Sequence, residues 1–166
     1  MQAQALQDSL RPAAYGHALI DMLDGAALFS GFEWSELEVL ARYTSAFEAD
    51  TGHMLFREGD PGDRLYILVS GRIETYKQDE VRHRAVIATD GAGKSVGEMA
   101  LIDGEPRSAS CVVRQPSILI ALGRDSFAKL AKSHPAIAFR VLSRVARLIS
   151  RRLRATSGRL VEYMHG

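Results

Sequence analysis

The stretch that decides the fold is Leu55-Phe56-Arg57-Glu58-Gly59-Asp60-Pro61-Gly62-Asp63-Arg64-Leu65-Tyr66-Ile67-Leu68-Val69-Ser70-Gly71-Arg72-Ile73-Glu74. It holds short apolar runs separated by glycine, proline and aspartate, which is the pattern of strands joined by turns. The segment 60–63 is predicted to be a type II turn, because Pro61 fixes φ at its second position and Gly62 accepts a positive φ at its third. Ser70-Gly71 predicts a further tight reversal.

The same pattern of short apolar runs separated by turn residues extends over residues 46–123. Runs of about four to eight residues, each ended by glycine, proline or a polar cluster, predict strands. They cover residues 46–50, 54–57, 64–70, 72–77, 81–88, 109–114 and 117–122. Short strands at this spacing indicate an all-β roll or barrel.

Helical periodicity flanks this region on both sides. Residues 15–29 predict a helix with a break near Gly25, and a second helix begins at about Ser35, whereas residues 1–14 are interpreted as a lead-in. After Arg124 a short helix is predicted, and then a longer helix with Pro135 in its first turn. We therefore expect a mainly β protein with flanking helices. It has an N-terminal helical segment (1–45), a jelly-roll-like β-roll (46–123) and C-terminal helices (124–166).

Composition limits the function only weakly. The chain has 166 residues, a length that predicts one domain. Its net charge of +1 indicates no particular class of binding partner. Its single cysteine forms no internal disulfide, and no histidines stand at a metal-ligand spacing, so no cofactor or metal is expected. No long apolar run or signal peptide is present, which predicts a cytoplasmic protein without a membrane contact.

Residues Gly97-Glu98-Met99-Ala100-Leu101-Ile102-Asp103-Gly104-Glu105-Pro106-Arg107-Ser108-Ala109 carry the candidate chemistry. The arginine at 107 can meet two phosphate oxygens at once, and the carboxylate at 98 is the strongest acceptor for a ribose hydroxyl. If residues 98–102 form a helical turn, its free backbone N–H groups would point toward the phosphate. The alternatives are a surface arginine after a turn, and a carboxylate that favours a helix dipole or pairs with Arg107 in the empty site.

These two stretches together resemble the cyclic nucleotide-binding domain family, over residues from about 28 to the C-terminus. The resemblance implies that residues 97–109 form a phosphate-binding cassette. In it Glu98 contacts the ribose, Arg107 the cyclic phosphate, and Ser108 the phosphate or the base. The backbone of Gly97, Met99 and Ala100 lines the pocket, and Ala109 leaves room beside the sugar. Val96 departs from the family pattern, which often has an aromatic residue there.

Residues 150–157 resemble the central helix of the catabolite-activator branch of this family. The resemblance implies that Thr156 and Ser157 contact adenine, with the serine supplied by the partner subunit. Hydroxyls both donate and accept hydrogen bonds, which suits the adenine edge. The alternative is a Thr-Ser pair at a fraying helix end before Gly158, a residue that weakens a long helix by about 1 kcal/mol.

The sequence thus predicts a non-enzymatic, stand-alone sensor that binds a cyclic purine mononucleotide, with cAMP favoured and cGMP also possible. Binding is expected to shift the C-terminal helix, whose apolar stripe predicts a homodimer, and to signal to an unknown downstream protein. No recognition helix follows this helix in the chain, so no direct DNA binding is expected. Two rivals remain: the dimerisation domain of a transcription regulator with a degenerate pocket, and a cupin-like β-roll dioxygenase.

Overall fold

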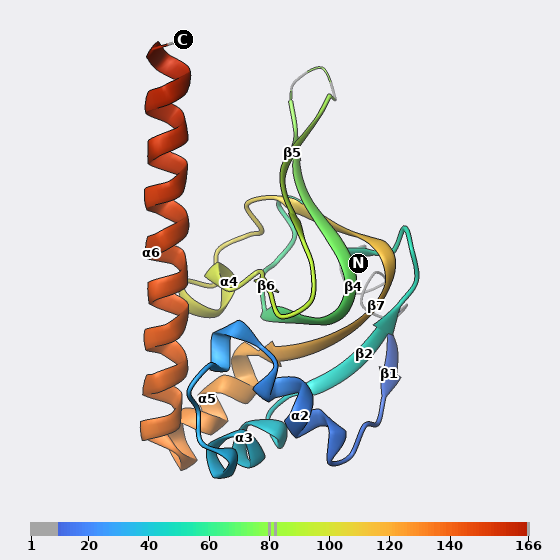
Figure 1. Cartoon of the computed structure of the whole chain (residues 1–166), viewed down its shortest axis with the longest axis vertical. Helices are drawn as coiled ribbons and strands as arrows, with labels where there is room; N and C mark the ends of the chain where they lie inside the picture. Colours follow the sequence, from blue (N-terminus) through green and yellow to red (C-terminus); the bar gives the residue numbers. More distant parts are fainter. Residues whose placement is uncertain (1–9, 80, 82, 166) are drawn as a thin grey trace.

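The computed structural model describes residues 10–79, 81 and 83–165, and its centre is an antiparallel sheet rolled into a β-roll (Figure 1). The strands are β1 (Arg11–Ala13), β2 (Ser45–Ala49), β3 (Met54–Phe56), β4 (Arg64–Gln78), β5 (Arg84–Asp90), β6 (Ser95–Val96) and β7 (Ser110–Gly123). Their order is β1-β2-β7-β4-β5, with β3 paired to β7 and β6 paired to β4. The predicted roll is confirmed, although residues 11–13 form an edge strand instead of belonging to a lead-in.

Helices gather at one end of the roll and along one side of it (Figure 1). They are α2 (Ala18–Asp24), the 3-10 helix η1 (Ala27–Phe29), α3 (Trp34–Ala41), α4 (Met99–Ile102), α5 (Arg124–Ser133) and α6 (Pro135–His165). The predicted break near Gly25, the short turn after residue 98 and the long C-terminal helix are all present. Gly158 does not interrupt α6, so the alternative of a helix end before this residue is wrong.

Two pairs of predicted strands are in fact single long strands. Ser70-Gly71 is a bulge inside β4, where the register against β7 shifts, and the predicted reversal there is wrong. Gly71 has a φ of 95°, and a Cβ at this position would meet the Ser117 side chain and the Pro116 carbonyl. Glycine marks bulges as well as turns, so the local signal is the same for both. The bulge bends the β4–β7 pair while leaving it continuous.

The predicted type II turn at 60–63 is displaced. The positive φ belongs to Gly59, at 84°, in a turn closed by the Asp60 N–H donating to the Arg57 carbonyl at 3.1 Å. Gly62 serves another purpose, because a Cβ there would collide with Ala100 and with the Glu105 carbonyl. This glycine therefore lets the turn approach the 97–109 segment closely.

Alternating side chains divide the core into two clusters. Leu65 and Ile67 of β4 pack against the helices, whereas Tyr66 and Leu68 of the same strand point into the roll. This is the period of two that a strand with both faces covered requires. Because one strand pair serves both clusters, the helices and the roll interior are held by a single rigid element.

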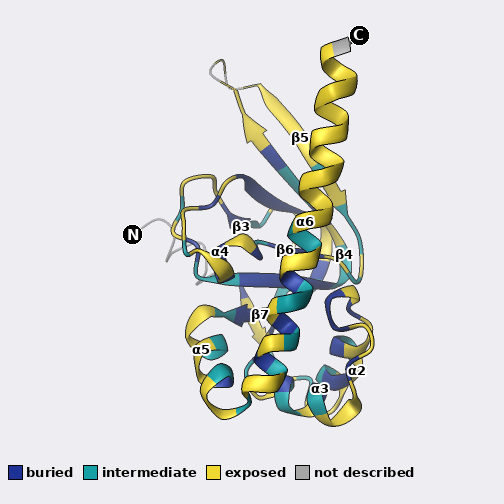
Figure 2. Ribbon diagram, turned by 90° about the vertical axis from the view of Figure 1, so that its left-hand side faces the viewer, coloured by how far each residue is buried: buried dark blue, intermediate teal, exposed yellow. Residues whose placement is uncertain are grey.

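The long helix α6 is supported along only part of its length. Val141 and Val145 are fully buried against the rest of the protein, whereas every residue from 150 to 164 is exposed (Figure 2). Isolated helical turns are marginal in water, so this second half lacks the packing that normally stabilises a helix. No helix in the described part of the chain is long and apolar enough to cross a membrane.

Candidate functional site

A pocket of about 210 Å³ lies where the roll, α4 and α6 meet. Its walls come from the ends of β3, β4 and β5, from the segment 96–109, and from α6. All seven predicted residues of that segment line it: Gly97, Glu98, Met99, Ala100, Arg107, Ser108 and Ala109. The structure therefore brings the predicted cation and carboxylate to one cavity.

Arg107 is a buried cation, only 6% exposed. Its guanidinium donates to the carbonyl oxygens of Gly97 (3.1 Å) and Arg64 (2.8 Å) and lies over the Phe56 ring at 4.2 Å. Its Nε has no hydrogen-bond partner, and no carboxylate forms an ion pair with it among the described residues. Burial lowers the pKa of Arg107 from its ordinary value. An uncompensated buried charge is costly, so this side chain favours an incoming anion.

Glu98 is buried still more deeply, at 2% exposure. One of its oxygens, Oε1, forms an ion pair with Arg152 of α6, and the other, Oε2, has no hydrogen-bond partner. The alternative that Glu98 pairs with Arg107 in the empty site is wrong, because the partner comes from α6. The free oxygen leaves Glu98 able to accept a hydrogen bond from a ligand in the pocket.

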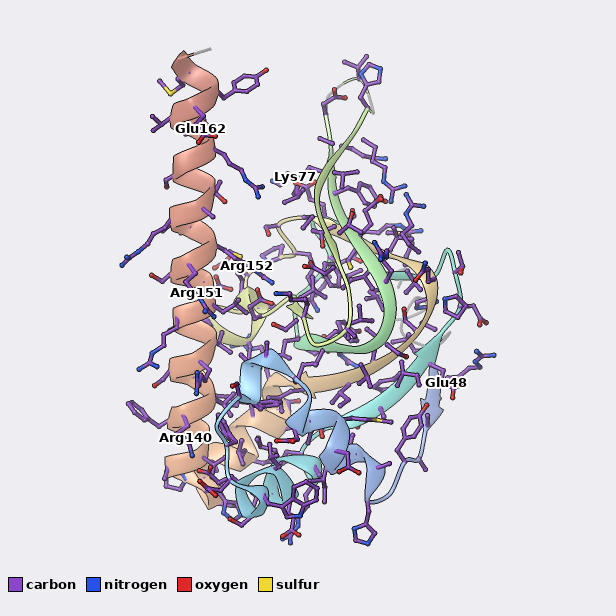
Figure 3. The ribbon with its side chains drawn as sticks, in the orientation of Figure 1. Glu48, Lys77, Arg140, Arg151, Arg152 and Glu162 are labelled. Carbon is purple, nitrogen blue, oxygen red and sulfur yellow. The ribbon has the colours of Figure 1, made fainter. Side chains whose placement is uncertain are left out.

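Arg152 joins α6 to this site and was not singled out in the sequence. Its guanidinium reaches Glu98 and also donates to the Ser95 carbonyl at 2.8 Å (Figure 3). Burial lowers the pKa of Arg152 from its ordinary value, against the raising effect of the Asp90 carboxylate. The sequence showed only one arginine among several in this stretch, so no local signal separated it from a solvated residue.

The backbone around Gly97 explains the shape of the pocket. Gly97 has a φ of 77°, and a Cβ there would press into the guanidinium of Arg107. The helix α4 follows at once, and the Leu101 N–H donates to the Glu98 carbonyl at 3.1 Å. Met99 and Ala100 are the first residues of this helix, so their N–H groups have no partner within it.

Gly97→Ala should therefore damage both stability and the site. A side chain at this φ costs about 1–2 kcal/mol in the free energy of unfolding, and the added methyl group displaces Arg107. Thermal denaturation, monitored by circular dichroism, measures the loss of stability. Gly158→Ala is the matched control, because a Cβ at that position meets no neighbour, and helix propensity favours alanine there. A Gly97→Ala protein as stable as the wild type would contradict this account.

Thr156 and Ser157 do not line the pocket. Both are exposed on α6, and their hydroxyls donate to the carbonyl oxygens of Arg152 and Leu153, each at 2.9 Å. Thr156 lies one helical turn beyond Arg152, which does line the pocket. Residues that the sequence did not indicate form the opposite wall, namely Ile87, Ala88 and Asp90 of β5.

Metal chemistry finds no support among the described residues, where no group of three or more histidine, cysteine, aspartate or glutamate side chains lies together. Cys111 is fully buried, and burial raises the pKa of its thiol to about 12. A thiol with that pKa is protonated at neutral pH and is a poor nucleophile.

Comparison with known proteins agrees with this geometry. Residues 47–134 match the family model described as "Cyclic nucleotide-binding domain". A "Cyclic AMP receptor protein" from Thermus thermophilus is 31% identical over 132 residues, which is 80% of this chain and 59% of that protein. A "CRP-like cAMP-activated global transcriptional regulator" from Mycobacterium tuberculosis is 28% identical over 86% of this chain. The chain spans 62% of that regulator's length.

A solved structure is similar over nearly the whole chain. It is a cyclic nucleotide-binding domain from Methylobacillus flagellatus, with a TM-score of 0.77 and 30% sequence identity. The match covers 98% of this chain and 85% of that one. The similarity therefore includes the roll, the segment 97–109 and α6.

Proposed function

Because the chain belongs to the cyclic nucleotide-binding domain family, we propose that its pocket binds a cyclic purine mononucleotide, with cAMP favoured over cGMP. One observation carries the proposal. A buried arginine without a carboxylate partner and a buried glutamate with one unpaired oxygen, both judged within the described part of the chain, line the same cavity. A cyclic phosphate joined to a ribose presents an anion and a hydroxyl donor on one rigid ring system. The anion can pair with the arginine, and the hydroxyl can donate to the glutamate.

Each end of the ligand then has its own partners. Arg107 binds the cyclic phosphate, assisted by the N–H groups of Met99 and Ala100 and by the Ser108 hydroxyl. Glu98 accepts the ribose 2′-hydroxyl on Oε2, while Oε1 keeps its contact with Arg152. The base lies toward the apolar side chain of Ile87 on β5. No bond is made or broken in this scheme, so the ligand acts as a signal.

The preference for cAMP follows from α6 and from the relatives. Two of the relatives carry cyclic AMP in their names. Thr156 and Ser157 offer hydroxyls one turn beyond the pocket, and these exchange their present bonds to helix carbonyls for bonds to the adenine edge when α6 packs over the base.

Nucleotide binding affects the position of α6 through Arg152. The nucleotide shares Glu98 with this arginine and therefore changes the balance of contacts that holds α6 to the roll. A ligand that favours one helix position shifts the population toward it. The output is a signal to a downstream protein.

Arg152→Gln should loosen α6 without unfolding the roll. The glutamine keeps a polar side chain but loses the ion pair to Glu98, whose carboxylate is then left buried and unpaired. We expect amide hydrogen exchange over residues 146–154 to accelerate about fivefold, measured by mass spectrometry, since a partly exposed charged contact contributes about 1 kcal/mol. Arg159→Gln, on the same helix and also exposed, is the control. Equal exchange in both variants would refute the role of Arg152.

We further propose that α6 forms a homodimer. Residues at alternating three- and four-residue steps give it a heptad seam, which lies about 80° around the helix from the buried valines. Ile149, at the inner edge of this seam, also packs against the core. The seam consists of Phe139, Leu142, Ala146, Ile149, Leu153, Thr156, Leu160 and Tyr163. Leu153 is 66% exposed and Leu160 is 60% exposed, and a second copy would cover both side chains.

Calorimetric titration with cAMP, cGMP and a cyclic dinucleotide in parallel tests the proposal. We expect one site per chain, with cAMP binding more tightly than cGMP. The dinucleotide should not bind, because a pocket of about 210 Å³ is already small for a ligand site. Absence of heat with both mononucleotides would favour the alternative, a dimerisation domain with a degenerate pocket.

A further inference from the structure

A second hollow, of about 910 Å³, lies beside α6 and is not used by the proposed nucleotide site. It is bounded by η1, by the turn before β6 and by α6. Six cationic residues line it, and we call it the cationic groove: Lys94, Arg144, Arg147, Arg151, Arg152 and Arg154. Leu28 of η1 and Leu148 of α6 supply apolar lining between these charges.

The arginines of α6 differ in whether their side chains form ion pairs and hydrogen bonds with the rest of the protein. Arg140 forms an ion pair with Glu36 and donates to the Gly31 carbonyl, and Arg144 donates to the Ser30 carbonyl. These contacts fasten the first half of the helix to the loop after η1. Arg147, Arg151 and Arg154 continue the same row, but none of their side chains has an ion pair or hydrogen bond within the described residues.

Few carboxylates of the described residues lie near this row of arginines. The helix α6 carries seven arginines and a single acidic residue, Glu162, beyond the end of the groove. Of the residues that the structure describes, Asp90 is the one that lines the groove with a carboxylate. Like charges held in a row repel one another, so the arrangement gains stability from an anionic partner that the chain itself does not provide.

The groove stays open in the proposed dimer. On a helix of 3.6 residues per turn, the row at 147, 151 and 154 points about 130° away from the heptad seam at 146, 149 and 153. Association through the seam therefore covers the apolar side chains and leaves the arginines accessible.

We propose that the cationic groove binds an acidic segment of a partner protein, with carboxylates at three- and four-residue spacing and an apolar side chain between them. This inference rests on the proposed function, since it names the surface through which the sensor reaches its downstream protein. The arginines at 147, 151 and 154 form a line along α6 instead of converging on one point, which matches a row of carboxylates better than a single phosphate. The apolar lining from Leu28 and Leu148 has no use in binding a phosphodiester chain, but it accommodates an aliphatic side chain.

Two residues connect the groove with the nucleotide pocket. Arg152 and Asp90 line both cavities, and Arg152 is the residue that pairs with Glu98. A segment docked in the groove and a nucleotide in the pocket therefore act on the same side chains. Each is expected to change the affinity of the other by the same factor.

The test uses a fluorescein-labelled helical peptide with glutamates at this spacing and one central leucine, titrated with the full chain and followed by anisotropy. We expect binding that weakens as salt is added, because the contacts are electrostatic. The variant Arg147→Gln/Arg151→Gln/Arg154→Gln should weaken it at least about tenfold. Arg42→Gln/Lys129→Gln/Lys132→Gln removes the same charge from exposed positions elsewhere and should leave binding unchanged.

Three results would overturn the proposal. The first is equal binding of a peptide in which glutamine replaces every glutamate. The second is unchanged peptide binding in the arginine variant. The third is a labelled DNA duplex that binds more tightly than the peptide and loses affinity in the arginine variant, which would assign the groove to nucleic acid. Peptide binding that persists in a protein unable to bind cAMP or cGMP would refute the nucleotide proposal and leave this one intact.

Discussion

Arg107→Ala is expected to weaken cyclic nucleotide binding about tenfold to a hundredfold, which corresponds to a loss of about 1.5–3 kcal/mol. The guanidinium is buried beside Phe56 and makes no ion pair with a carboxylate in the described part of the chain, so the ligand phosphate is its only full charge partner. Calorimetric titration measures the loss. Arg107→Lys should recover only part of the affinity, because lysine keeps the charge but not the planar fork.

The same variant should change stability far less than affinity. Removing a buried charge without a partner relieves a desolvation cost, which offsets the loss of its hydrogen bonds to the Gly97 and Arg64 carbonyls. The melting temperature of Arg107→Ala should therefore stay close to that of the wild type. Arg72→Ala, an exposed arginine on β4, is the control for affinity. Equal affinity of wild type and Arg107→Ala would remove the arginine from the site.

Leu153→Glu combined with Leu160→Glu is expected to convert the proposed dimer to a monomer. Each leucine buried in a helix seam contributes about 1.5–3 kcal/mol, so the pair should raise the dissociation constant by two orders of magnitude or more. Facing glutamates in a parallel pair also repel each other. Analytical ultracentrifugation over a concentration series measures the change.

The control for the seam variant adds the same charge on another face of the same helix. Ala155→Glu with Val161→Glu introduces two glutamates at exposed positions that point away from the seam. This protein should remain dimeric. A wild type that is monomeric at every concentration, or a control as dissociated as the seam variant, would refute the dimer.

Local features of the fold were predictable because they depend on residues close together in the chain. The short apolar runs over residues 46–123, each ended by glycine, proline or a polar cluster, predicted β-structure, and the roll is confirmed. The identity of individual turns was less secure. Gly71 lies at a bulge and Gly62 at a close backbone approach, because a glycine in the sequence shows that space or a positive φ is needed but not which of the two.

The placement of the candidate site was also largely predictable. Glu98 and Arg107 are nine positions apart in one segment, and a short helix with a turn brings them to one cavity. Their roles toward a ligand remain predictions. The sequence could not place Thr156 and Ser157 in the same way. Their contact with a ligand depends on where the second half of α6 lies relative to the roll, and on a second subunit.

The sequence by itself determined the strand-rich centre, the long terminal helix and the 97–109 segment that lines the pocket, because backbone preferences and turn chemistry act over a few residues. Only the tertiary structure decided that Arg152 pairs with Glu98 across more than fifty positions, and that the residues of α6 divide into a buried face, an apolar seam and an arginine row. The periodicity of a helix shows that it has faces. What each face meets is set by packing between distant segments, which no local pattern encodes.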